Sequence, residues 1–191
     1  KAPSHKFKGT SKRTLDIIMH AAEVHDLIQW VPGVSGYWSA QNIRSVFVRG
    51  METRISSSAP VSFGRISWLI NYSLTASEIS SSDVLNDKSV GKQTIYTPYH
   101  HLNAHATAEY RFIHAGTGFI TESRRYTTTD NSEWLPLSSQ ININAGARFR
   151  LFEYSVSLDL SVNNLLNSQW EGIPNYPMPL RTFFMKLKIE L

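Results

Sequence analysis

The sequence predicts an all-β fold, an antiparallel transmembrane β-barrel of about eight up-and-down strands. Apolar and polar residues alternate over most of the chain, and long connections between the alternating segments are separated by short ones. No apolar run approaches the roughly 18 residues that a membrane-spanning helix needs. Strands with one apolar face are not excluded by that finding, because a transmembrane barrel places its apolar side chains at alternate positions.

The composition fits a folded chain and excludes several kinds of chemistry. The 191 residues are 41% hydrophobic and 18% charged, with a net charge of +4. This apolar content argues against disorder, and the small, scattered positive charge gives no basis for nucleic-acid binding. The absence of cysteine excludes disulfides, thiolate metal sites and a cysteine nucleophile.

The first half of the chain contains four segments with strand character. Segments 14–30 and 42–57 are the weaker ones, because their alternation is interrupted, as at Ala21-Ala22. In 65–80 the residues from Ile66 to Tyr72 alternate regularly, and in 100–113 those from Leu102 to Phe112 do the same. Successive side chains of a strand point to opposite faces, so each segment predicts one apolar and one polar face.

The second half contains four more segments of this kind. Segment 118–129 is interrupted at Arg124-Arg125, whereas 138–151, 154–167 and 181–191 alternate almost without a break. We therefore predict strands at 14–30, 42–57, 65–80, 100–113, 118–129, 138–151, 154–167 and 181–191. Gly116-Thr117-Gly118 is interpreted as part of a hairpin turn.

The connections predict two different ends of the barrel. Outer-membrane barrels have short periplasmic turns and long outer loops. The outer loops would be chiefly 31–41, 81–99, 130–137 and 168–180. Aromatic residues there offer rigid contact area for a ligand. The candidate ligand contacts are Tyr37, Trp38, Tyr96, Tyr99, Trp134, Trp170 and Tyr176. Membrane-interface girdles or packing within the loops would explain the same aromatics.

The polar face is rich in arginine, asparagine, serine and histidine, which suits a hydrated lumen. Alternation alone does not distinguish such a barrel from a soluble barrel with an apolar interior. The candidate lumen-lining residues are His101, His105, Glu109, Arg111, Arg148, Arg150 and Asp159.

No motif predicts an enzyme, a cofactor or a metal. His101 and His105 lie four residues apart on one strand, about 13 Å, too far to share an ion. The carboxylates Glu109 and Asp159 are expected to pair with arginines of the polar face, namely Arg111, Arg148 or Arg150.

Four ordered segments resemble the TonB-dependent outer-membrane receptors. Segment 162–167 reads VNNLLN and segment 176–183 reads YPMPLRTF, similar to the strand, loop and final-strand entry of that family. Segment 96–103, YTPYHHLN, resembles the family's entry into a downward strand. The series formed by 26–32, 38–42 and 50–52 is also similar, and its tryptophans look most like the cobalamin and siderophore members.

The resemblance implies that 1–191 is a single β-barrel segment, the last eight strands of a 22-stranded barrel. Nothing before residue 14 resembles a plug domain or a TonB box, so we expect neither in this chain. The implied function is uptake of a small nutrient, such as cobalamin or a ferric siderophore, across a bacterial outer membrane. The implied partners are outer-membrane lipid, the plug domain, an energising TonB-type protein and, as a further candidate, a surface lipoprotein.

Two alternatives remain open from the sequence. One is a self-contained eight-stranded outer-membrane barrel with a structural or adhesive role, which requires pairing between the first and last strands. The other is a soluble ligand-binding barrel with an apolar interior.

Overall fold

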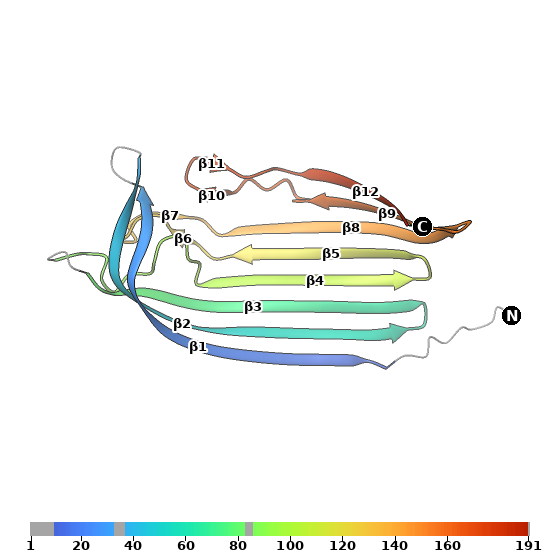
Figure 1. The fold of residues 1–191 in the computed structure, drawn as a ribbon, viewed down its shortest axis with the longest axis horizontal. Coiled ribbons are helices and arrows are strands. Elements are labelled where there is room, and N and C mark those ends of the chain that lie inside the picture. Colours follow the sequence, from blue (N-terminus) through green and yellow to red (C-terminus); the bar gives the residue numbers. More distant parts are fainter. Residues whose placement is uncertain (1–9, 33–36, 83–85, 191) are drawn as a thin grey trace.

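Eight long strands form one antiparallel sheet (Figure 1). The computed structural model describes residues 10–32, 37–82 and 86–190. The sheet contains β1 (Lys12–Pro32), β2 (Trp38–Val61), β3 (Gly64–Ser81), β4 (His100–Tyr110), β5 (Ile113–Glu122), β8 (Ser138–Leu151), β9 (Tyr154–Asn163) and β12 (Thr182–Glu190). Neighbours in the sheet follow one another along the chain, in the order β1-β2-β3-β4-β5-β8-β9-β12. The predicted all-β, up-and-down antiparallel arrangement is confirmed. No helix in the described part of the chain is long and apolar enough to cross a membrane.

The two ends of the sheet differ as the sequence predicts. Two-residue turns at 62–63, 111–112 and 152–153 join strands at one end, on the right in Figure 1. Arg111 and Phe152 open two of these turns with positive φ, a conformation that tight hairpins often require. The longer connections lie at the opposite end. Two of them contain small hairpins, β6 (Arg125–Tyr126) with β7 (Trp134–Leu135), and β10 (Glu171–Ile173) with β11 (Tyr176–Pro177).

One predicted turn is wrong. Gly116-Thr117-Gly118 lies inside β5, and the turn before this strand is Arg111-Phe112. Gly116 allows a side chain of the neighbouring strand to approach its backbone and does not reverse the direction of the chain. A Cβ added to Gly116 would lie 2.6 Å from Oδ1 of Asn144 on the neighbouring strand. The predicted strand 118–129 therefore begins earlier and ends at Glu122, before a separate short strand.

Strand register gathers the apolar side chains on one face. Residues directly opposite in antiparallel strands point to the same side. One row crosses seven strands through Met185, Leu160, Ala145, Ala115, Ala108, Ile66 and Ala59. These side chains lie outside any core, as shown by exposed fractions of 74% for Met185 and 49% for Leu160.

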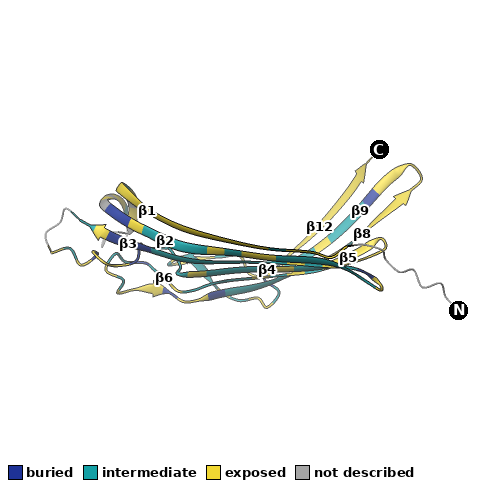
Figure 2. Cartoon of the chain, turned by 90° about the horizontal axis from the view of Figure 1, so that it is seen from below, coloured by how far each residue is buried: buried dark blue, intermediate teal, exposed yellow. Residues whose placement is uncertain are grey.

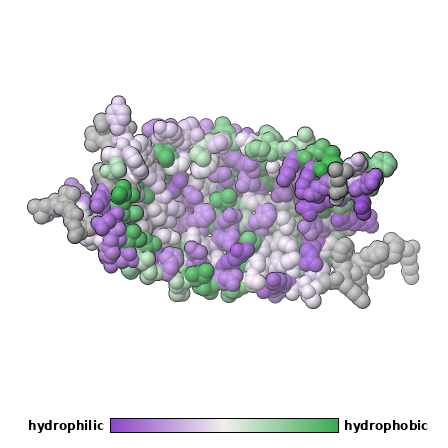
Figure 3. Space-filling view, in the orientation of Figure 1, coloured by the Kyte–Doolittle hydropathy of each residue, from purple (hydrophilic) through white to green (hydrophobic). Residues whose placement is uncertain are grey.

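The adjacent row carries the polar face. It passes through Lys186, Asp159, Gly146, His114, Glu109 and Arg65, which are paired in the same way. Figure 2 shows the sheet bent into an open trough, with β1 and β2 rising on one side and β8, β9 and β12 on the other. Polar residues dominate the middle of the inner face of this trough (Figure 3).

The sheet does not close on itself. Within the described residues β1 pairs only with β2, and β12 pairs only with β9. A self-contained eight-stranded barrel would need a β1–β12 pair, so the observed architecture is not that alternative. Nor does the described chain enclose an apolar interior, because its buried hydrophobic residues are few: Val46, Ile79, Ile95, Leu135 and Val156.

The two faces give matched substitutions on β9. In a lipid bilayer, Leu160→Arg is expected to lower the free energy of unfolding by about 2–4 kcal/mol, because a charge on the lipid-facing side of a barrel is poorly solvated. Ser161→Arg points to the polar face and is expected to change it by less than about 1 kcal/mol. Equilibrium unfolding of the membrane-embedded protein measures both. Equal tolerance of the two arginines would contradict this assignment of the faces.

Candidate functional site

The polar face of the sheet forms a polar wall that contains six of the seven residues predicted to line a lumen. Strand pairing places His101, His105, Glu109, Arg148, Arg150 and Asp159 on one face. Arg111 lies beyond the end of β4, in a two-residue turn, where its guanidinium stacks 5.1 Å from the ring of Tyr110. These six residues come from β4, β8 and β9, and His114 adds a polar side chain from β5 to the same face.

A side-chain hydrogen bond crosses the wall above a glycine. His114 Nε2 on β5 lies 2.9 Å from Asp159 Oδ1 on β9, and Gly146 of β8 lies between them. A Cβ at Gly146 would come within 2.5 Å of His114 Cε1 and 2.6 Å of Asp159 Oδ1. The absence of a side chain thus lets two non-adjacent strands touch. The expectation of an arginine partner for Asp159 is wrong, because register brings His114 to it.

A second polar chain leads from the wall toward the loops. His101 Nε2 lies 3.8 Å from Glu122 Oε1, and Glu122 Oε2 lies 3.4 Å from Nη1 of Arg125. Arg125 is 8% exposed and donates from Nη2 to the carbonyl oxygen of Glu171, 2.8 Å away. Arg125 of β6 therefore connects the Glu122 side chain of β5 to the backbone of β10, and Glu122 extends this connection to His101 of β4.

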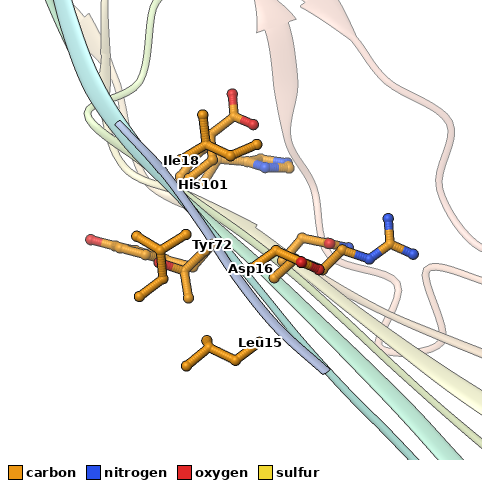
Figure 4. Close-up of a pocket in the computed structure, with 11 residues that line it drawn as sticks. Leu15, Asp16, Ile18, Tyr72 and His101 are labelled. Atoms are coloured by element: carbon orange, nitrogen blue, oxygen red, sulfur yellow. The ribbon is translucent and has the colours of Figure 1, made fainter. Parts of the chain in front are cut away.

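A hollow of about 810 Å³ lies where β1, β2, β3 and β4 meet (Figure 4). Figure 4 shows Asp16, Ile18 and His101 on one side of the β1 ribbon and Leu15 and Tyr72 on the other. Because its lining comes from both faces, this hollow wraps around the unpaired edge of β1 and is not an enclosed binding site. Among the described residues, no three His, Asp or Glu side chains gather as a metal site would require.

The loops at the long-connection end are folded against one another through Gln93. Its side chain accepts from the Ser77 amide at 2.9 Å and donates to the carbonyl oxygens of Thr75 and Thr97, each at 3.2 Å. Gln93 is 1% exposed, so these bonds are shielded from water. The connection between β3 and β4 is thereby fastened to the outer end of β3.

Asn131 joins this connection to the next one. Its Oδ1 accepts from the Gln93 amide at 3.0 Å, and its Nδ2 donates to the Gln93 carbonyl oxygen at 2.9 Å. Beside it, hydrogen bonds from Ser132 lower the pKa of Asp130 to about 2. Asp130, in the turn that presents Asn131, therefore stays ionised to a lower pH than an ordinary aspartate.

The predicted aromatic contacts fall into separate groups. Trp38 and Tyr96 meet with ring centroids 6.0 Å apart, and Trp170 immediately precedes Glu171, the partner of Arg125. Trp134 instead lies under the guanidinium of Arg124, at 5.7 Å. Tyr99 lies near Arg49 and Glu78; burial is the main cause that raises its pKa. Tyr37 and Tyr176 are exposed.

Sequence reasoning missed Gln93, Arg125 and Asn131, the residues that hold the loops together. Each is a polar residue in a segment without periodicity, and nothing local distinguishes it from a solvated loop residue. Arg125 was visible only as an interruption of alternation at Arg124-Arg125. Its burial depends on contacts with β5 and β10, which are distant in sequence.

These features define a class of protein: a β-barrel wall with an apolar outer face, a polar inner face and folded loops at one end. The chain belongs to the TonB-dependent receptors, because residues 22–165 match the family model described as TonB dependent receptor-like, beta-barrel. No curated protein sequence matches the chain significantly.

Solved structures share the fold. The ferric preacinetobactin receptor BauA from Acinetobacter baumannii aligns with a TM-score of 0.70 and 14% identity, over 94% of this chain and 27% of the receptor. The siderophore receptor PiuA from Acinetobacter baumannii aligns with a TM-score of 0.67 and 16% identity, over 92% of this chain and 26% of the receptor. The chain thus spans about a quarter of the length of either receptor.

Two glycines of the polar face allow a test of the His114–Asp159 contact. Gly146→Ala is expected to separate the pair and lower the free energy of unfolding by about 1 kcal/mol, the usual contribution of such a bond. Gly118→Ala is the control, because its Cβ would lie 3.8 Å from the nearest side-chain atom. In an Asp159→Asn background the Gly146→Ala effect should shrink. An undiminished effect there would show that the glycine acts independently of the pair.

Loss of the Gln93 side chain should loosen the loops and leave the wall intact. Gln93→Ala removes three hydrogen bonds inside a buried site. We therefore expect the free energy of the local opening that permits amide exchange in residues 87–99 and 125–135 to fall by about 2–3 kcal/mol. Hydrogen exchange followed by mass spectrometry measures this segment by segment. Gln140→Ala, on the polar face of β8, is the control. Equal loss of protection in β4 and β5 would contradict a role confined to the loops.

Proposed function

We propose that this chain is the C-terminal barrel part of an outer-membrane active-transport receptor for a small nutrient, a ferric siderophore or cobalamin. The observation that carries the proposal is the combination of a polar inner wall with interlocked loops at one end of it. Such an arrangement offers a binding surface at the mouth and a hydrated path beneath it. Family membership supports the same function; BauA is named as a ferric preacinetobactin receptor and PiuA as a siderophore receptor.

In this proposal the two faces of the sheet have different partners. The apolar outer face contacts outer-membrane lipid, since an exposed apolar band of this extent has no favourable contact in water. The polar wall, including His101, His105, Glu109, Arg148 and Asp159, contacts a plug domain. An energising TonB-type protein acts on that plug, and a surface lipoprotein is a further candidate partner. Binding and gating, not chemical conversion, constitute the activity.

The loop aromatics are the proposed ligand contacts. Tyr96 lies near the buried Arg125 and meets Trp38, and Trp170 precedes Glu171, whose carbonyl oxygen accepts from Arg125. Tyr37 and Tyr176 are exposed and able to meet an incoming ligand. Tyr99 and Trp134 are the remaining candidates, and Arg124 lies close to both.

Ligand binding to the full-length receptor tests the proposal. Quenching of intrinsic tryptophan fluorescence is to be titrated with ferric citrate, a ferric trihydroxamate chelate, a ferric tricatecholate chelate and cobalamin. At least one should bind with a dissociation constant below about 1 μM, and Trp38→Ala should weaken it about tenfold, as for a buried aromatic contact. Trp68→Ala, on the apolar face of β3, is the control. Failure of all four probes to bind would contradict the proposed function.

A further inference from the structure

Three hydrogen-bond donors in the loops lie buried without a partner. Among the described residues these are the Tyr96 hydroxyl, Nε of Arg125 and Nε1 of Trp170. Native proteins leave few buried polar atoms unsatisfied, so each such atom requires an explanation. Because these three unsatisfied atoms lie in loops that are bonded to one another, a single bound group is the simplest explanation for all of them.

Hydrogen bonds link the three segments that carry these side chains. The amide of Tyr96 donates to the carbonyl oxygen of Tyr126, the residue after Arg125, over 2.8 Å. Arg125 in turn holds the carbonyl oxygen of Glu171, the residue after Trp170. The phenol of Tyr96 is near enough to Arg125 for the guanidinium charge to act on its pKa, although burial raises that pKa overall.

The unpartnered atoms form a set of donors. An arginine Nε–H and an indole N–H donate only, and a neutral phenol donates through its proton. Glu122 and the Glu171 carbonyl oxygen use the Nη atoms of Arg125, which leaves Nε. A carboxylate offers several lone pairs in the plane that a guanidinium edge matches, and its bonds to such donors are stronger than those of a neutral acceptor, whereas a cationic group would be repelled by Arg125.

We propose that Arg125, Tyr96 and Trp170 hold a carboxylate of the transported iron chelate. The inference rests on the proposed function and adds the chemical class of the ligand. The three donor atoms have almost no exposed surface, so the carboxylate reaches them only when the loops part. Carboxylate binding is therefore coupled to a change in loop packing, because the carboxylate binds only the receptor whose loops have parted.

Substitutions that remove only the donor test the proposal. Tyr96→Phe and Trp170→Phe keep the aromatic bulk and leave the Arg125–Glu171 bond in place. Ferric citrate, which carries carboxylates, and a neutral ferric trihydroxamate chelate are to be titrated against the full-length receptor. Each substitution is expected to lower the affinity for ferric citrate about tenfold or more, because hydrogen bonds to charged groups contribute most to binding. The affinity for the trihydroxamate chelate should change by less than about twofold. Tyr154→Phe and Trp68→Phe, on the apolar face of the sheet, are the controls and should change neither affinity.

Other outcomes overturn the inference in distinguishable ways. Unchanged ferric citrate affinity with a raised melting temperature would show that the donors are unsatisfied structural atoms. Equal weakening of both probes would show that they hold another part of the receptor, such as a plug carboxylate. Binding of the trihydroxamate alone by the unsubstituted receptor would refute the carboxylate and leave the proposed function standing. Binding of neither probe, nor of the tricatecholate or cobalamin, would remove the proposed function and the inference with it.

Discussion

Each strand of this sheet must present its apolar side chains on the same side as its neighbours, and most other features depend on that requirement. Side chains alternate with a period of two, so a slip of one residue in any strand would bring polar and apolar residues onto the wrong faces. The row from Met185 to Ala59 shows that no such slip occurs over seven strands. With one face apolar, the polar groups are confined to the other face, where His114 and Asp159 meet.

The wall and the loops form one connected structure. Glu122, near the outer end of β5, contacts both His101 on the wall and Arg125 beneath the loops. Gln93 and Asn131 fasten two successive connections to each other through reciprocal bonds. In the proposed function, a ligand that displaces the loops would therefore act on residues that are bonded, through Glu122, to the inner face. This provides a physical route between the mouth and the interior.

The local alternation of apolar and polar residues predicted the strands. The features that it did not predict depend on contacts between residues distant in sequence. The strands 138–151 and 154–167 were predictable because alternation is a property of neighbouring residues, and β8 and the start of β9 agree with them. The turn predicted at Gly116 was wrong, because glycine favours turns but also permits the close approach of a neighbouring side chain, here that of Asn144. The partner of Asp159 depends on register across two strands. The burial of Arg125 depends on β10, 46 residues away in sequence. Neither is visible in a local window.

The central claim is that the apolar face of the sheet contacts lipid and the polar face lines an enclosed aqueous space. Spin labels placed singly from 156 to 162 on β9 of the full-length receptor in bilayers measure this directly. The account predicts that collision with lipid-soluble oxygen peaks at the even positions and collision with a water-soluble nickel chelate peaks at the odd ones. Uniform access of the nickel chelate, or the reverse alternation, would contradict it.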